Sequence, residues 1–198
     1  GPDIPISVFS IQTKVYTIVL SIVTGIVLGG QPIFGYNYGA KRMDRVREAY
    51  KIVLRATLIT GITATIIFQL WPKVVVGIFG SGNGLYQEFA VKTFRIYLPL
   101  MTVTCLVKMT AVFFQSIGKS KHAVMASVIR DIICFTPLAI ILPAILEGSE
   151  SGTGINGILY AAPISDLVAI AVIFVLTISF FRKLNKEIVI EEQKELAS

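Results

Sequence analysis

Long apolar runs alternate with short polar segments along the chain. Each run approaches the length of about 20 residues that an α-helix needs to cross the hydrocarbon core of a bilayer. The runs predict five membrane-spanning helices, at about 8–38, 52–70, 96–117, 123–146 and 158–181, followed by a polar tail at 182–198. The pattern therefore predicts an all-α membrane protein in which five helices form a transmembrane bundle.

Glycine and proline divide these runs further. Gly25 and Gly29, and then Gly35 and Gly39, are each four residues apart, a spacing that predicts close approach of neighbouring helices on one face. The glycine-rich segment 74–86 is predicted to be a turn or a short surface segment. The third span is interrupted by Pro99, which removes a backbone donor and clashes with the preceding turn.

Composition supports a membrane location. The chain of 198 residues has only 15% charged residues and a mean hydropathy of +0.75, which argues against a soluble domain. Its two cysteines, Cys105 and Cys134, lie inside apolar runs and are expected to act as small hydrophobic residues. The net charge of +6 raises the question of a nucleic-acid or anionic-lipid partner, and its distribution decides against nucleic acid.

The positive charges are segregated into alternate connections. They follow the first, third and fifth predicted spans, as Lys41, Arg42, Arg45, Arg47, Lys51 and Arg55, as Lys119 and Lys121, and as Arg182, Lys183 and Lys186. By the positive-inside rule these segments are cytoplasmic, which places the N-terminal end of the chain outside and the C-terminus in the cytoplasm. A chain with this topology and an odd number of spans is expected to have at least one more helix upstream.

Two segments resemble a known transporter family. GIVLGGQPIFGYNYGAKRMDRVREAY at 25–50 and FFQSIGKSKHAVMASVIRDIICFTPLAIILP at 113–143 are similar to the C-terminal lobe of the multidrug and toxic compound extrusion (MATE) transporters, in the bacterial branch that includes MepA and DinF-like proteins. The resemblance implies twelve helices in two six-helix lobes around a central cavity. The five spans would then be helices eight to twelve, and the N-terminal lobe and the seventh helix would be partners outside this chain.

The resemblance also implies a function. A protein of this kind exports amphipathic, often cationic drugs across the bacterial plasma membrane in exchange for H⁺ or Na⁺, surrounded by membrane lipids and without a cofactor. Two alternatives stay open at this point: a lipid-linked glycan flippase of the same superfamily, and a truncated scaffold that does not transport. The sequence shows no set of residues typical of an enzyme, and Gly118-Lys119-Ser120 lacks the earlier glycine of a phosphate-binding loop.

Charged groups at membrane depth are costly, so each is a functional candidate. Lys108 is predicted either to carry a charge in the cavity or to form a buried ion pair that fixes helix packing. Asp131 is a candidate partner for Lys108 or for the coupling cation, or else an interfacial residue near the end of its helix. The predicted cavity-lining residues share hydrogen-bonding side chains: Gln31, Tyr36, Asn37, Lys108, Gln115 and Asp131.

Asp166 is the second cation-coupling candidate. It follows Pro163, whose missing N–H leaves a carbonyl free nearby, and a carboxylate beside free carbonyls can hold a proton or Na⁺. The alternative is a structural residue near the outer headgroups. Members of the NorM-like branch carry an acidic residue on the helix that corresponds to 96–117, whereas this chain has Thr102, Thr104 and Lys108 there, which puts a NorM-type site in doubt.

Overall fold

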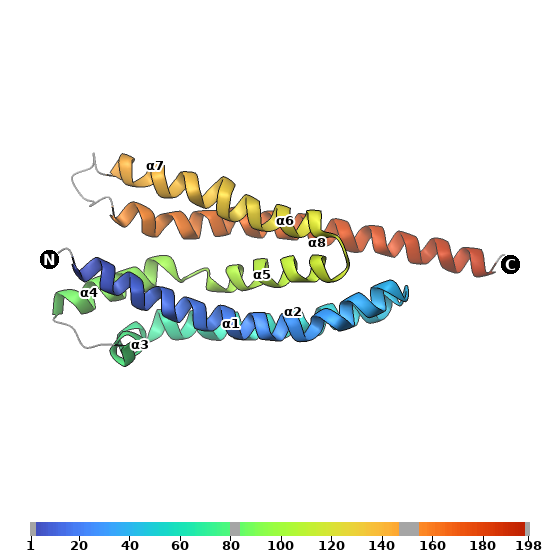
Figure 1. The fold of residues 1–198 in the computed structure, drawn as a ribbon, viewed down its shortest axis with the longest axis horizontal. Coiled ribbons are helices and arrows are strands. Elements are labelled where there is room, and N and C mark those ends of the chain that lie inside the picture. Colours follow the sequence, from blue (N-terminus) through green and yellow to red (C-terminus); the bar gives the residue numbers. More distant parts are fainter. Residues whose placement is uncertain (1–2, 80–83, 147–154, 197–198) are drawn as a thin grey trace.

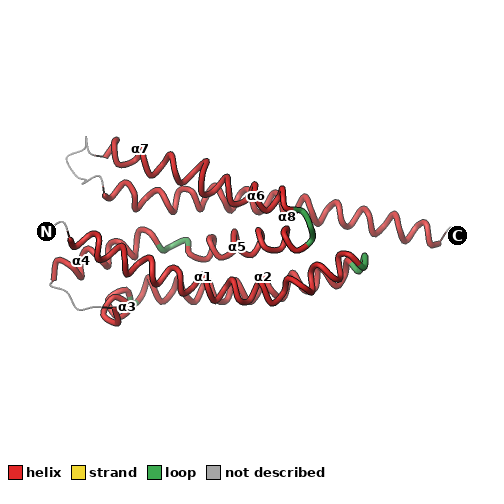
Figure 2. Tube along the Cα trace, viewed as in Figure 1, coloured by secondary structure: helices red, strands yellow, loops and turns green. Residues whose placement is uncertain are grey.

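The computed structural model describes residues 3–79, 84–146 and 155–196, and these residues form helices joined by short turns. The helices are α1 (Asp3–Gly39), α2 (Met43–Leu70), α3 (Pro72–Phe79), α4 (Gly84–Tyr97), α5 (Met101–Ser116), α6 (Ser120–Val128), the π-helix η1 (Ile129–Phe135), α7 (Thr136–Leu146) and α8 (Ile155–Leu196). Figure 2 shows that turns occupy little of the described chain. Helices predominate because each one satisfies its own backbone hydrogen bonds, as a bilayer requires.

The long helices form one elongated bundle (Figure 1). Helices α1 and α2 lie side by side, α7 pairs with α8, and α5 contacts α1, α2, α6 and α8 from the centre. Most α5 residues are buried, including Met101, Cys105, Met109, Phe113 and Phe114. Because α5 holds the two helix pairs together, changes on this helix are expected to affect the whole bundle.

The chain reverses direction so that its basic connections gather at one end of the bundle. The turn between α1 and α2, the turn between α5 and α6, and the distal part of α8 lie at this end, which we call the basic end (Figure 1). Lys41 adopts a left-handed conformation in the first turn (φ 57°), and Gly118 does so in the second (φ 73°). Helix α8 continues to Leu196 and extends beyond the bundle, so the described part of the tail predicted from 182 is helical.

Length and hydropathy single out three described helical segments as able to cross a membrane by themselves: Ser7–Gly39, Met43–Leu70 and Pro163–Leu184. The segments Tyr86–Tyr97 and Met101–Ser116 add a fourth if they form one broken span with a bend of 48°. This bend lies at 98–100, where Pro99 removes the backbone donor as expected. The fourth predicted span is occupied by α6, η1 and α7 in succession, which include the shorter apolar helix Ile132–Pro143.

Part of the segment 74–86 is helical. Helix α3 covers Pro72–Phe79, and Pro72 occupies its first position, where a missing N–H costs nothing. Val74 and Ile78 are 61% and 74% exposed, which fits the predicted short surface segment but not a turn.

The glycine prediction was correct at one position of four. A Cβ on Gly35 would lie 3.1 Å from the backbone oxygen of Ser116, so α1 and α5 approach closely there. Gly25, Gly29 and Gly39 have no described atom within 4 Å of such a Cβ, so the prediction was wrong for them within the described residues. The other close approaches are at Gly30, beside Val53, and at Gly61, beside the backbone of Thr102.

Aromatic side chains from four helices meet near the basic end. We call this group the aromatic cluster; it consists of Phe34, Tyr38, Tyr50, Phe113, Phe114, Phe180 and Phe181. Phe113 is its centre, with its ring centroid 4.8 Å from Tyr50 and 5.1 Å from Phe34. Edge-to-face pairs of this kind stabilise beyond the area they bury. The cluster therefore joins α1, α2, α5 and α8.

Candidate functional site

Asp166 is a carboxylate buried between α5 and α8. It is 3% exposed, and the hydroxyl of Thr104 donates a hydrogen bond to its Oδ2 over 3.2 Å. Thr104 is 5% exposed. Burying a charged carboxylate is costly unless polar groups compensate for the lost water. The pair is therefore a site where the gain or loss of one proton or cation changes the energy of packing α5 against α8.

The sequence of α8 positions this carboxylate. Its buried residues recur at helical spacing, as Ala161, Ser165, Asp166, Ala169 and Ile173, and form the face toward the bundle. Ala169 and Ile173 pack against Val103 and Val107 of α5 in a small apolar cluster. Asp166 lies at the edge of this cluster, where small neighbours let the two helices approach.

Pro163 adds a backbone feature to the same region. It lies inside α8 and has no N–H to donate to the carbonyl of Leu159, which is therefore left without its usual helical partner. A carboxylate, a hydroxyl and backbone carbonyls are the oxygen donors with which discontinuous helices hold H⁺ or Na⁺ in transporters. The described residues contain no group of three or more His, Cys, Asp or Glu side chains that could hold a metal ion.

The predicted cavity residues occupy several surfaces. Lys108 and Gln115 are exposed and lie about two turns apart on one face of α5. Lys108 forms no ion pair with a described residue. On α1, Tyr36 is 70% exposed and Gln31 is half-buried. These positions face whatever surrounds the described chain, and their role in a cavity stays a prediction.

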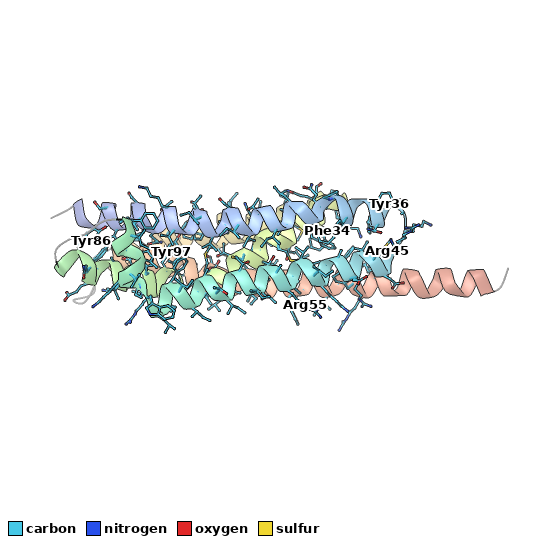
Figure 3. All side chains as sticks on the ribbon, turned by 90° about the horizontal axis from the view of Figure 1, so that it is seen from below. Phe34, Tyr36, Arg45, Arg55, Tyr86 and Tyr97 are labelled. Carbon is cyan, nitrogen blue, oxygen red and sulfur yellow. The ribbon has the colours of Figure 1, made fainter. Side chains whose placement is uncertain are left out.

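Asn37 and Asp131 differ from this exposed set. Asn37 is 7% exposed and its Nδ2 donates to the carbonyl of Ile33 over 2.8 Å. Figure 3 shows neighbouring Tyr36 at the surface of α1, whereas Phe34 lies toward the interior. Asp131 belongs to η1, a wide helical turn of a type that often marks functional sites. Its side chain lies outside the described residues, so its proposed pairing with Lys108 is untested.

Two interactions were not predicted from the sequence. Thr104 and Asp166 are separated by 62 residues, and the hydroxyls of Thr65 and Thr102, which lie 3.1 Å apart, are separated by 37. A threonine in an apolar helix is a signal for such bonds, but it does not name its partner. Phe113 and Phe114 are 1% and 0% exposed, so their rings pack within the aromatic cluster and are not available to stack on a drug.

Cations cover the aromatic cluster at the basic end. The Nζ of Lys119 lies 4.6 Å from the ring centroid of Phe180 and 5.8 Å from that of Tyr38. Arg47 lies over Phe181 at 6.0 Å. These distances permit cation–π attraction, which is worth about 0.5–1 kcal/mol at an exposed site. The turn between α5 and α6 is thereby held against α1 and α8.

Comparison with known proteins identifies the family. The MatE family model matches residues 2–142, more than half of the chain. The chain belongs to the MatE family. MatE proteins are transporters and not enzymes, and together with the apolar helices this makes the chain part of a multi-pass membrane protein. No curated protein matches its sequence.

Solved structures of MATE transporters share the fold. The chain is similar to an outward-facing multidrug resistance MATE transporter of the MOP superfamily, with 17% identity, a TM-score of 0.79 and coverage of 94% of this chain and 40% of that one. It is also similar to the MATE multidrug transporter DinF-BH, solved in complex with a drug, with 28% identity, a TM-score of 0.75 and coverage of 92% and 38%. The chain thus spans about two fifths of these transporters, roughly one of their two lobes.

Proposed function

We propose that this chain is the C-terminal lobe, helices eight to twelve, of a bacterial multidrug efflux transporter of the DinF-like branch. Membership of the MatE family and 28% identity to DinF-BH, whose structure holds a bound drug, support the proposal. The resemblance to multidrug transporters favours drug export over the flippase alternative. The substrates are amphipathic, often cationic compounds, and the N-terminal lobe with the seventh helix completes the cavity.

Orientation follows from charge. The basic end collects the turns at 40–42 and 117–119 and the distal part of α8, and the positive-inside rule places this end in the cytoplasm. The exposed side chains of Tyr36, Lys108 and Gln115 and the half-buried side chain of Gln31 then supply polar groups for the cavity wall. Alternating access moves this lobe against its partner lobe around a site near the middle of the membrane.

The observation that carries the coupling proposal is the buried pair of Asp166 and Thr104. When Asp166 binds H⁺ or Na⁺, its charge is neutralised and α5 and α8 pack closely around it. When the ion leaves, the bare carboxylate in an apolar seam is costly and favours an arrangement that admits water. An ion that binds the two arrangements unequally shifts their populations by that difference in affinity.

Replacing Asp166 with asparagine tests this coupling. Asn keeps the shape and can still accept the Thr104 hydrogen bond, but it cannot ionise. In the complete transporter, expressed in cells that lack other exporters, we expect Asp166→Asn to reduce ion-driven ethidium efflux on the order of tenfold or more, within the usual range of coupling energies. Exchange of drug without an ion gradient should persist, because the fold is retained.

Asp44→Asn is the matched control, since Asp44 is an exposed carboxylate in the first turn of α2. It should export at the parent rate. Gradient-driven efflux by Asp166→Asn at the parent rate would show that this carboxylate does not couple transport. Loss of gradient-free exchange along with efflux would assign Asp166 a structural role, while drug export by the parent would still support the proposed function.

A further inference from the structure

A groove on the outer side of the α1–α2 pair has the composition of a lipid-binding site. Near the basic end it has a volume of about 410 Å³ and is lined by Gly30, Ile33, Asn37, Arg45, Glu48, Ala49, Ile52 and Val53. Its wall is mainly apolar, with one cation, one anion and one amide at the end closest to the basic turn. Helix α5 packs on the other side of α1 and α2, so this groove faces outward.

The amide in this wall has an unmet hydrogen bond. Asn37 is 7% exposed; its Nδ2 donates to Ile33, but its Oδ1 has no donor among the described residues. A buried acceptor without a partner costs about 1–3 kcal/mol. Rotation of the side chain toward the groove would give Oδ1 access to a donor there. The groove therefore favours a ligand that carries N–H or O–H groups.

Charge narrows the class of ligand. Arg45 and Glu48 are both exposed on α2, one turn apart, and both line the groove. A guanidinium binds phosphate oxygens through two parallel hydrogen bonds, whereas a carboxylate accepts from an ammonium group. Because their charges cancel, the groove matches a zwitterion that carries a phosphate and a primary amine better than it matches an anion.

The apolar seam continues from this groove toward the other end of the bundle. A second cavity of about 440 Å³ lies between the same two helices, lined by Val15, Ile18, Val19, Ile22, Ile59, Thr60, Thr63, Ala64, Ile67, Phe68, Val75 and Phe79. Ile22 and Asn37 are about 22 Å apart along α1 at 1.5 Å per residue. This length exceeds the half-thickness of about 15 Å of the hydrocarbon core, so the seam can hold an acyl chain along its whole depth.

We infer that the α1–α2 groove binds a phospholipid with an ethanolamine headgroup from the leaflet at the basic end. Arg45 holds the phosphate, Glu48 and the Asn37 amide oxygen accept from the ammonium, and an acyl chain lies along the apolar seam. This lipid satisfies the buried amide and fills the space between two helices that otherwise meet closely only at Gly30 among the described glycines. The inference does not depend on transport and concerns a surface away from the Asp166 pair.

Native mass spectrometry of the full chain in detergent tests the inference directly. The protein is mixed with equal amounts of phosphatidylethanolamine, phosphatidylcholine and phosphatidylglycerol of the same acyl composition. We expect phosphatidylethanolamine to be retained about tenfold or more over phosphatidylcholine, which has the same phosphate but no donor on its amine. A charge-assisted hydrogen bond of about 1.5–3 kcal/mol corresponds to this ratio.

Exposed variants separate the groove from general attraction to a basic surface. Arg45→Gln and Glu48→Gln should each lose the ethanolamine preference, and Asn37→Leu should weaken it. Arg55→Gln should keep it, since Arg55 is an exposed arginine of the same helix that does not line the groove. Figure 3 shows Arg45 beside the space between α1 and α2 and Arg55 at the outer edge of α2.

The remaining outcomes overturn the inference. Equal retention of phosphatidylethanolamine and phosphatidylcholine would mean that the amine is not recognised. Preferential retention of phosphatidylglycerol would show that only the positive charge of the basic end attracts lipid. An equal loss of preference in Arg45→Gln and Arg55→Gln would exclude the groove as the site. Circular dichroism of each variant confirms that the helices remain, because the two charged positions in the groove are exposed.

Discussion

Replacing Phe113 with alanine is expected to destabilise the protein by about 3 kcal/mol, the lower end of the range for a buried Phe→Ala change. The ring is 1% exposed and makes ring contacts with partners from α1, α2, α5 and α8, including Phe34 at 5.1 Å and Phe180 at 5.6 Å. Lipid tails are as apolar as this core, so moving the ring into lipid costs little. The loss comes instead from the cavity and from the ring contacts that no neighbour replaces.

Thermal unfolding in detergent, followed by far-ultraviolet circular dichroism, measures this change. For a chain of this size about 1 kcal/mol corresponds to about 2–4 °C, so the midpoint should fall by about 6–12 °C. Phe174→Ala is the matched control, because Phe174 is 66% exposed on α8. Its midpoint should shift much less. Equal shifts in the two variants would show that the aromatic cluster does not hold the bundle together.

The helices were the most predictable part of this molecule. A chain in a bilayer must satisfy its backbone within each segment, so a long apolar run permits few structures other than a helix. The break at Pro99 followed from the chemistry of proline. The helix ends were less predictable: α2 begins at Met43, before its apolar run, and α4 begins at Gly84 because charged residues such as Lys92 continue a helix beyond the apolar core.

Contacts between helices were much less predictable. The four-residue spacing of Gly25 and Gly29 places them on one face of α1, but it does not say which face meets a neighbour. That face is decided by residues far along the chain, such as Thr102 opposite Gly61 and Ser116 opposite Gly35. For this reason the prediction was correct at Gly35 alone.

The candidate site shows the same limit. Membrane depth and a nearby proline were enough to select Asp166, because burying a charge is costly whatever surrounds it. Its partner Thr104 could not be selected, since threonines in apolar helices also bond to their own helix, as Thr65 does to the carbonyl of Gly61. Exposure was equally hidden: the sequence does not show that Lys108 points out of the described bundle while Asn37 points into it.

Gly61 is the position where a small substitution should have the second large effect. A Cβ there would lie 2.9 Å from the Cα of Thr102, and backbone of a packed helix cannot yield as a flexible side chain can. Leucine adds three further carbons to this clash. Overpacking of this kind costs about 1–3 kcal/mol and occasionally more, and we expect Gly61→Leu to reach about 3 kcal/mol because α2 and α5 must separate.

Gly25→Leu provides the comparison, because both glycines lie inside long helices and gain similar helix propensity from the change. No described atom lies within 4 Å of a Cβ on Gly25, so this variant should unfold at or slightly above the parent temperature. Gly61→Leu should unfold about 6–12 °C below it in the same detergent. The sign of the difference is decisive: if both variants are stabilised, α2 and α5 do not touch at Gly61, and the central position of α5 in the bundle is wrong.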